Sequence, residues 1–361
     1  MGMKKISDWD RTTRQNAVTY GMVTIAFVIM QTLSSCGALS SSMKGQLVPI
    51  CAYIVMAISL NLTVGISGEL SLGHAGFMSV GAFSGVVAAA CMESAVPNGI
   101  LRLILTMLIA GLFAGVFGFL IGIPVLRLRG DYLAIVTLAF GEIIRNVMDC
   151  LYIGLDNRGL HFSLTNNSPM QLAEGGRMLV NGPMGATGIK ELSVFAVGFG
   201  LVMLTLFIVL NLINSKEGRA IKASRDNRIA AESIGLNVTA FKMKAFVVSA
   251  VLAGMAGALF AMNYSTIMAK KFDFNTSINI LVFVVLGGMG NIRGSIIAAS
   301  LLYILPELLR GDFADMRMLI YAVILILVTL FTWSPNLKNF RERIKVKYPL
   351  KKPSRKEADV Q

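Results

Sequence analysis

The most constraining feature of the sequence is a series of long apolar stretches without a charged residue. A helix that crosses a bilayer needs about 20 mostly apolar residues, because its side chains face hydrocarbon while its backbone satisfies its own hydrogen bonds. Seven stretches reach or approach that length, and they predict seven membrane-spanning helices. They are residues 17–33, 46–64, 70–92, 103–126, 192–213, 245–267 and 318–333.

Three further stretches are shorter or interrupted. Residues 132–150 begin as an apolar run but include Glu142 and Arg145, whereas 276–292 and 294–306 lie on either side of a glycine cluster. The last two indicate either two short spans or the halves of a broken helix. The sequence therefore predicts an all-α fold, a polytopic bundle of about 8–10 transmembrane helices, some of them short or broken.

The charge distribution supports this fold and orients it. Only 15% of the residues are charged, against roughly 25% in soluble domains, which excludes an ordinary soluble globule. With the N-terminus inside, the inside segments hold 23 Lys and Arg residues and the outside segments hold nine. Because the cytoplasmic side carries the excess of basic residues, both termini are predicted to be cytoplasmic. The net charge of +13 then follows from topology, and no nucleic-acid-binding motif accompanies it.

This topology divides the chain into three parts. A cytoplasmic arm covers residues 1–16, a transmembrane domain covers 17–335, and a basic cytoplasmic tail covers 336–361. The tail is expected to lie against anionic lipid headgroups. The four cysteines show no C-x-x-C spacing, and there are only two histidines, so a Cys/His metal site is not expected.

Two loops are long. The outside loop, residues 151–191, is polar with scattered Gly, Asn and Pro, so we expect it to be irregular. The inside loop, residues 214–244, lacks Pro and contains small and apolar residues at helical spacings, which predicts a short amphipathic helix. Those residues are Ala220, Ala223, Ile229, Ala230 and Ile234, and Gly235 stands where a helix stop is expected. The inside loop is either a solvated basic connection or a docking helix for a cytoplasmic partner.

Several segments together resemble one family of transport proteins. The inside loop from Gly218 to Leu236 is similar to the coupling loop of ABC-importer permeases. Three segments resemble the branched-chain amino-acid permeases of the LivM type, and residues 241–261 also fit. The three are NLTVGISGELSLGHAGFMSVG at 61–81, PVLRLRGDYLAIVTLAFGEIIRN at 124–146 and VVLGGMGNIRG at 284–294. The resemblance extends from about residue 49 to about residue 335.

The resemblance implies that the inside loop docks on an ATPase subunit, although one position departs from the importer signature. That signature is Glu-Ala-Ala, three residues, then Gly. Counting back from Gly235 places Ile229, Ala230 and Ala231 in the first three positions, so no acidic contact is expected at residue 229. The implied coupling residues are Gly218, Arg225, Asp226, Arg228, Ala230, Ala231, Glu232 and Gly235.

The resemblance also implies a subunit of an ATP-driven importer in the bacterial plasma (inner) membrane, not an enzyme. The chain has no G-x-x-x-x-G-K-[ST] loop, so it is not the P-loop ATPase, and ATP is expected to be used by partner subunits with no cofactor in this chain. The implied partners are a second permease subunit, two ATP-binding subunits and an extracytoplasmic amino-acid-binding protein. The implied solutes are branched-chain or similar amino acids, with urea or short amides as the alternative.

An ion-coupled secondary carrier is the competing class, and Glu142 is its best candidate for a coupling carboxylate. It lies ten residues after Tyr132, which is about 15 Å along a helix and close to the membrane midplane. Arg145 lies one turn later and can neutralise the carboxylate. Glu142 is therefore a member of a structural ion pair, a residue that lines a polar path, or a proton relay.

Two glycine-rich segments are candidates for the path of the solute. Glycine permits helices to approach closely, and it also permits a span to break and expose helix-end amides and carbonyls. Close packing alone is the alternative, and His74 is expected to be a hydrogen-bonded residue at a helix end. The candidate path residues are Gly68, Ser71, Gly73, His74, Gly76, Glu142, Arg145, Gly287, Gly288 and Gly290.

Overall fold

The computed structural model describes residues 11–308, except 38, 94, 129, 157–158 and 165–175, together with residues 322, 323 and 326. The chain forms two units, residues 1–304 and 305–361, and the description below concerns the first. The predicted tail at 336–361, the first ten residues of the predicted arm and all but three residues of the predicted span at 318–333 lie outside the described residues.

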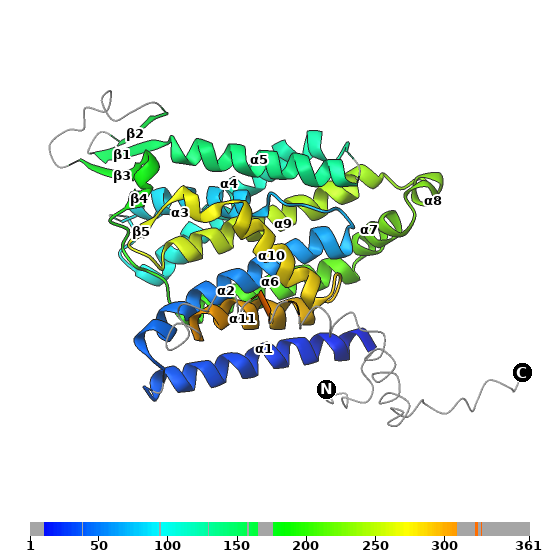
Figure 1. Cartoon of the computed structure of the whole chain (residues 1–361), viewed down its shortest axis with the longest axis horizontal. Coiled ribbons are helices and arrows are strands. Elements are labelled where there is room, and N and C mark those ends of the chain that lie inside the picture. The colour runs from blue at the N-terminus through cyan, green and yellow to red at the C-terminus, as the bar shows by residue number, and fades with distance from the viewer. Residues whose placement is uncertain are drawn as a thin grey trace, which may run out of the picture. The chain divides into compact units, whose positions relative to one another are not determined.

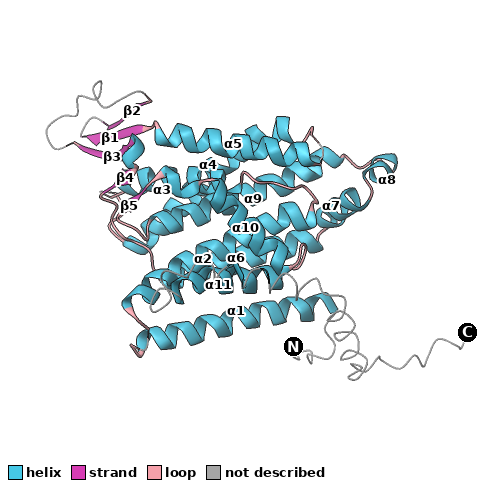
Figure 2. Ribbon diagram, in the orientation of Figure 1, coloured by secondary structure: helices cyan, strands magenta, loops and turns pink. Residues whose placement is uncertain are grey.

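Helices dominate the described residues, which confirms the predicted all-α membrane fold (Figure 2). Within the described residues, six helical segments are long and apolar enough to cross a membrane, and each corresponds to one of the predicted spans. They are Asn16–Ser35, Ser41–Ile66, His74–Cys91, Gly99–Val125, Phe195–Asn214 and Val238–Ala261. The helices are α1 (Arg11–Ser35), α2 (Ser41–Asn61), α3 (His74–Cys91), α4 (Gly99–Val125), α5 (Asp131–Asp149), α6 (Phe195–Asn214), α7 (Lys216–Asp226), α8 (Arg228–Ser233), α9 (Val238–Ala261), α10 (Phe274–Gly287) and α11 (Ile292–Leu308).

The core of the first unit lies where α9 packs against α2, α3 and α4. The apolar part of the segment Ser41–Ile66 is almost entirely buried, whereas that of Asn16–Ser35 is mostly exposed. Small residues allow the close approach in the core: a Cβ at Gly81 of α3 would overlap the backbone of Gly254 in α9. The outward face of α4 exposes large apolar side chains such as Leu112 and Leu120, as expected for a helix surrounded by lipid tails.

The prediction that the outside loop is irregular is wrong, because much of the loop forms a sheet. Its strands are β1 (Tyr152–Asp156), β2 (Gly159–Ser163), β3 (Arg177–Asn181) and β4 (Ala186–Thr187), and β5 (Thr266–Ile267) follows α9. All pairs are antiparallel, in the order β2-β1-β3-β4-β5. Val180, Ala186 and Ile267 are paired along the sheet and fully buried. The sheet therefore ties the 151–191 segment to the end of α9.

Two helix boundaries also differ from the predicted spans. Helix α9 begins at Val238, where the side chain of Asn237 accepts a hydrogen bond from the Ala240 N–H, so it includes charged residues that were assigned to the loop. Helix α3 begins at His74, four residues later than predicted. The chain before it turns through Gly68, whose φ of +76° is readily available only to glycine.

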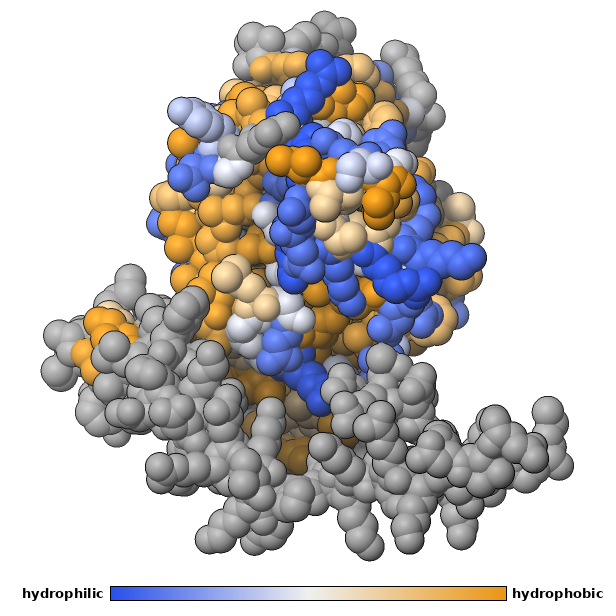
Figure 3. Space-filling model, turned by 90° about the vertical axis from the view of Figure 1, so that its right-hand side faces the viewer, coloured by the Kyte–Doolittle hydropathy of each residue, from blue (hydrophilic) through white to orange (hydrophobic). Residues whose placement is uncertain are grey.

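The sheet and helices α7 and α8 lie at opposite ends of the first unit (Figure 1). Figure 3 views the end that carries α7 and α8, where polar residues gather while apolar residues cover the flank. This distribution matches a bundle whose sides face lipid and whose ends face water.

Candidate functional site

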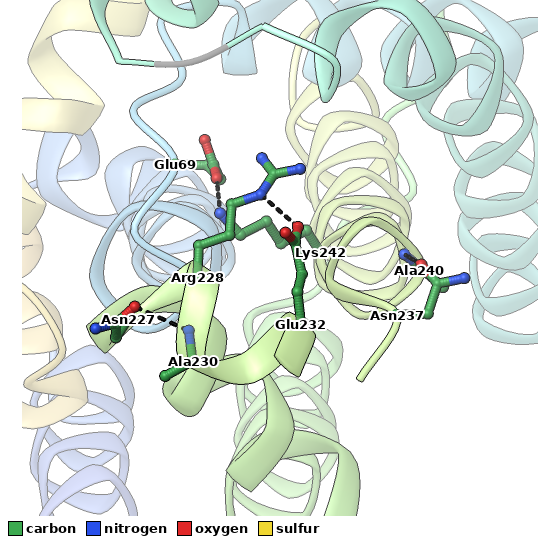
Figure 4. Close-up of polar contacts among 8 residues, drawn as sticks. All are labelled: Glu69, Asn227, Arg228, Ala230, Glu232, Asn237, Ala240 and Lys242. Carbon is green, nitrogen blue, oxygen red and sulfur yellow. Dashed lines mark hydrogen bonds and ion pairs between the residues drawn. The ribbon is translucent and has the colours of Figure 1, made fainter. Parts of the chain in front are cut away.

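The inside loop forms two short helices, α7 and α8, in place of the single helix predicted. Ser215 caps α7, its Oγ accepting a hydrogen bond from the Gly218 N–H at 3.1 Å. Asn227 then leaves the helical conformation (φ −152°, ψ 104°). Its side-chain oxygen accepts a hydrogen bond from the Ala230 N–H at 3.0 Å and so caps α8 (Figure 4). The cap explains why the helix divides at this residue.

The predicted apolar face of the loop is only partly correct. Of the predicted residues, Ala220 is buried, Ala223 is half-buried and Ala230 is exposed, whereas Ile221 and Ala231, which the spacing did not select, are buried. Ile229 and Ile234 were assigned to the same face but are 80% and 74% exposed. Gly235, with φ of +84°, ends α8 in the left-handed conformation. Ile229 of α8 and Ile234, directly after α8, are therefore exposed apolar side chains.

Arg225 connects α7 to the segment that follows α2. Its Nη1 donates a hydrogen bond to the carbonyl oxygen of Gly65 at 2.7 Å, and its Nε and Nη2 donate to Asp226 at 3.1 and 2.9 Å. The side chain passes directly over Gly68, where a Cβ would lie 2.5 Å from the Arg225 Cγ. One coupling residue and one path residue predicted from the sequence thus meet in the structure.

A second basic side chain, that of Lys242, also contacts the segment that follows α2. Lys242 in the first turns of α9 forms an ion pair with Glu69, and both side chains are largely buried (Figure 4). Removing one partner of such a buried pair destabilises a protein by about 3–5 kcal/mol. The predicted coupling residues Arg228 and Glu232 pair with each other across one turn of α8 at 2.8 Å. Nothing in the sequence pattern singled out Glu69 or Lys242.

The chain between α2 and α3 is a helix break, referred to below as the first break (residues 62–73). Residues Leu62–Ile66 form a π-helical turn, after which the backbone is irregular until His74. Single π turns in helices are frequently found at functional sites. Residues 288–291, between α10 and α11, form the second break, with positive φ at Gly288 and Gly290. Both predicted glycine segments therefore interrupt helices.

Asn61 joins the two breaks. Its Oδ1 accepts a hydrogen bond from the Gly290 N–H at 2.7 Å, and its Nδ2 donates to the Ser295 Oγ at 2.9 Å. A Cβ at Gly65 would overlap the backbone of Gly290. Asn61 is fully buried in an apolar helix, and a buried amide needs partners. An amide side chain in an apolar helix therefore indicates that a hydrogen-bond partner exists, but the sequence does not show that the partner lies more than 200 residues away.

Other glycines of the candidate path mediate close packing. A Cβ at Gly73 would overlap the Thr137 carbonyl of α5, and one at Gly287 would overlap the backbone of Ser295. His74 begins α3 and its Nε2 lies 2.8 Å from the Ser59 Oγ, as expected for a hydrogen-bonded residue at a helix end. For Gly76, a Cβ would lie 2.9 Å from the Gly141 Cα. A role for these residues in a solute path stays a prediction.

Three hydroxyl groups in or beside the first break are buried without a hydrogen-bond partner among the described residues. They belong to Thr63, Ser67 and Ser71. Buried hydroxyls are normally paired, so this cluster offers hydrogen-bonding capacity that the described chain does not use. Only Ser71 was selected from the sequence.

Glu142 and Arg145 form the ion pair that the sequence suggested. The Arg145 Nε donates to the Glu142 Oε2 at 2.7 Å, and the two side chains are partly exposed on α5. Arg145 also donates to the side-chain oxygen of Asn146 at 3.0 Å. The carboxylate is therefore neutralised locally, and its role stays a prediction.

Residues 42–329 match the sequence model of the family described as "Branched-chain amino acid transport system / permease component". The chain belongs to this permease family. Its members are transport components and not enzymes. This member, with six helices in its described part that are able to span a membrane, is a multi-pass protein of the inner membrane.

Individual members of the permease family are similar along most of the chain. A protein of Salmonella typhimurium, the high-affinity branched-chain amino acid transport system permease protein LivM, is 36% identical over 312 residues, covering 82% of this chain and 70% of the relative. The protein of that name in Escherichia coli is 37% identical with the same coverage. A probable LivM permease of Methanocaldococcus jannaschii is 24% identical over 284 residues, covering 71% and 78%. No solved structure matches the chain.

Proposed function

We propose that the chain is a membrane-spanning subunit of an ATP-driven importer that carries branched-chain or similar amino acids. In this proposal an extracytoplasmic binding protein delivers the solute, and two ATP-binding subunits and a second permease subunit complete the transporter. The names of the similar permeases support the class of solute. The observation that carries the proposal is the link from the α7–α8 element to the first break through Arg225 and Gly65.

The exposed face of α8 is suited to a protein partner. Ile229 of α8 and Ile234, directly after it, are exposed. Helix α8 lies at the end of the unit where polar residues gather (Figure 3). Apolar groups at a wet surface with polar surroundings are typical of contact sites. The proposed occupant is an ATP-binding subunit, because the family resemblance assigns that partner to this loop and the chain lacks a phosphate-binding loop of its own.

Movement of the α7–α8 element would reach both helix breaks by short contacts. Arg225 holds Gly65, and Lys242 at the base of the same loop holds Glu69. Asn61 then joins the first break to Gly290 in the second. Packed and hydrogen-bonded elements of this kind carry mechanical coupling between sites. A rearrangement of the ATP-binding subunits would therefore reposition the segments whose backbone groups are not held within helices.

The pairing of Glu142 with Arg145 supports ATP as the energy source over an ion gradient. A coupling carboxylate must change its protonation or its ion during the cycle, whereas this carboxylate accepts a hydrogen bond from its own helix neighbour. We expect Glu142→Gln to impair folding or assembly by leaving Arg145 unpaired in the membrane.

Uptake by reconstituted vesicles tests the proposal. Leucine should accumulate only when ATP, the ATP-binding subunits and the binding protein are all present, and collapse of the proton and sodium gradients should leave uptake intact. Gradient-driven uptake by this chain alone, lost in a correctly folded Glu142→Gln variant, would establish an ion-coupled carrier instead.

A further inference from the structure

A buried arginine lies at the sheet end of the first unit, far along the bundle from α7 and α8. Arg102 belongs to the first turn of α4, after the N-cap residue Asn98. The residue is only 7% exposed, and its Nε is buried without a hydrogen-bond partner among the described residues. An unpaired buried charge is strongly destabilising. The positive end of the helix dipole adds to that effect at this position.

Arg102 borders a cavity of about 330 Å³ between the end of α3, the start of α4, strand β3 and the segment leading to α6. Volumes of this size hold small-molecule ligands. The other charged residues of its described lining are Arg177, Lys190 and Glu93. The lining therefore contains three cations and one carboxylate, which leaves an excess of two positive charges.

The single carboxylate does not compensate Arg102. Glu93 forms ion pairs with Lys190 and with Arg177. The hydrogen bonds from Lys190 and Arg177 lower the pKa of Glu93 below its ordinary value, so the carboxylate is ionised and already engaged at neutral pH. The Arg102 guanidinium is therefore the cation of this lining that has no anionic partner among the described residues.

The remaining walls are mostly apolar. They include Val86, Ala89, Leu179, Ile189, Leu192 and Met262. One turn further along α4, the hydroxyl of Thr106 is also buried without a partner in the described part of the chain. An occupant that satisfies this cavity has a negative group for the guanidinium and an aliphatic portion for the walls.

We propose that this cavity binds an aliphatic α-amino acid, with its carboxylate on Arg102 and its side chain against the apolar walls. A planar guanidinium binds a carboxylate with two parallel hydrogen bonds. The identity of the ligand rests on the proposed function, since amino acids are the proposed solutes. In the proposed orientation the cavity opens at the outer end of the bundle, where a delivered solute arrives.

Direct binding to the assembled transporter tests this site. The complex is placed in phosphatidylcholine nanodiscs without binding protein or nucleotide, and radiolabelled leucine is titrated. We expect Arg102→Gln to weaken binding by about 10- to 100-fold, the range for losing hydrogen bonds to a charged group. Arg102→Lys should retain part of the affinity. Lys44→Gln, which removes an exposed cation of α2, is the matched control and should bind leucine normally.

Leucine analogues identify which group Arg102 recognises. 4-Methylvalerate keeps the carboxylate and should compete with leucine, whereas leucinol lacks the carboxylate and should not. If both compete equally in the wild type and in Arg102→Gln, the carboxylate assignment is wrong.

Thermal unfolding separates a ligand site from a structural arginine. Arg102→Met removes the unpaired charge, so it should not lower the Tm of the leucine-free complex, and it should abolish the rise in Tm that leucine causes in the wild type. A lower Tm for Arg102→Met together with no leucine effect on the wild type would overturn the proposal. The proposal would also be overturned if phosphatidylglycerol nanodiscs raise the Tm of the wild type but not that of Arg102→Met, while leucine has no effect on either. The ligand of Arg102 would then be an anionic lipid.

The outcome can be distinguished from failure of the proposed function. ATP-driven leucine uptake that proceeds unchanged in Arg102→Gln, with no leucine binding to the nanodisc complex, would remove this site and leave the importer assignment. Arg102-dependent leucine binding without ATP-driven uptake would support this site and contradict the importer assignment.

Discussion

Arg225 of α7 donates a hydrogen bond to the carbonyl oxygen of Gly65, 160 residues earlier in the chain, at 2.7 Å. The carbonyl belongs to the π turn that ends α2, and Gly68 leaves room for the arginine stem. A charge-assisted hydrogen bond to a backbone group contributes about 1.5–3 kcal/mol. This hydrogen bond links the α7–α8 element directly to the first break.

Loss of the Asn61 bridge should separate the two breaks. Asn61→Leu leaves the Gly290 N–H without its partner and removes the bond to Ser295, whose hydroxyl keeps a 3.3 Å hydrogen bond to the Asn291 carbonyl oxygen. A buried unpaired group costs about 1–3 kcal/mol. We expect a clear fall in Tm, by several degrees in a detergent-solubilised sample, and loss of uptake. Ser295→Ala removes only one of the two bonds and should lie between Asn61→Leu and the wild type. Equal stability of all three proteins would show that the bridge contributes nothing.

A charge introduced on the exposed face of α8 should prevent docking of the ATP-binding subunits without unfolding the protein. Ile229 is 80% exposed, so Ile229→Asp should leave Tm within about 1–2 °C of the wild type, as surface substitutions usually do. Co-purification of the ATP-binding subunits should fall at least tenfold. Phe162→Asp is the matched control, because Phe162 is 78% exposed on β2 at the opposite end. If both variants retain the ATP-binding subunits, α8 is only a solvated turn.

The two ends of the unit should lie on opposite sides of the membrane. In a background with Cys36, Cys91 and Cys150 replaced by Ser, Leu160→Cys should react with an impermeant maleimide added to intact cells. Ala230→Cys should react only after the membrane is permeabilised. Both positions are exposed. Labelling of both in intact cells would contradict cytoplasmic placement of α7 and α8.

The sequence predicts the membrane helices well because their signal is local. Uncharged apolar runs identify six of the described spans, and Gly68 and Gly290 mark positions where helices break. The limits of α9 were less accurate, since Lys242 resembles a loop residue until its partner Glu69 is known.

The features that the sequence missed depend on contacts between distant residues. The sheet joins β4 to β5 across about 80 residues, so its short strands resemble an irregular loop. Helix α8 separates from α7 at Asn227, so Ile229 is exposed although the spacing placed it on one face with the buried Ala220. Arg102 resembles an ordinary charge at a span end until its burial and its lack of a partner in the described chain are known.

The most direct test of the account is the ratio of leucine imported to ATP hydrolysed by the reconstituted transporter carrying Arg225→Met. The variant keeps the exposed face of α8, so ATP hydrolysis and retention of the ATP-binding subunits should stay close to wild type. Uptake should fall about tenfold or more, given the free energy of the lost hydrogen bond. Arg219→Met, at an exposed position of the same helix, should leave the ratio unchanged. An unchanged ratio for Arg225→Met, or a parallel loss of uptake and hydrolysis, would contradict the proposed coupling through Gly65.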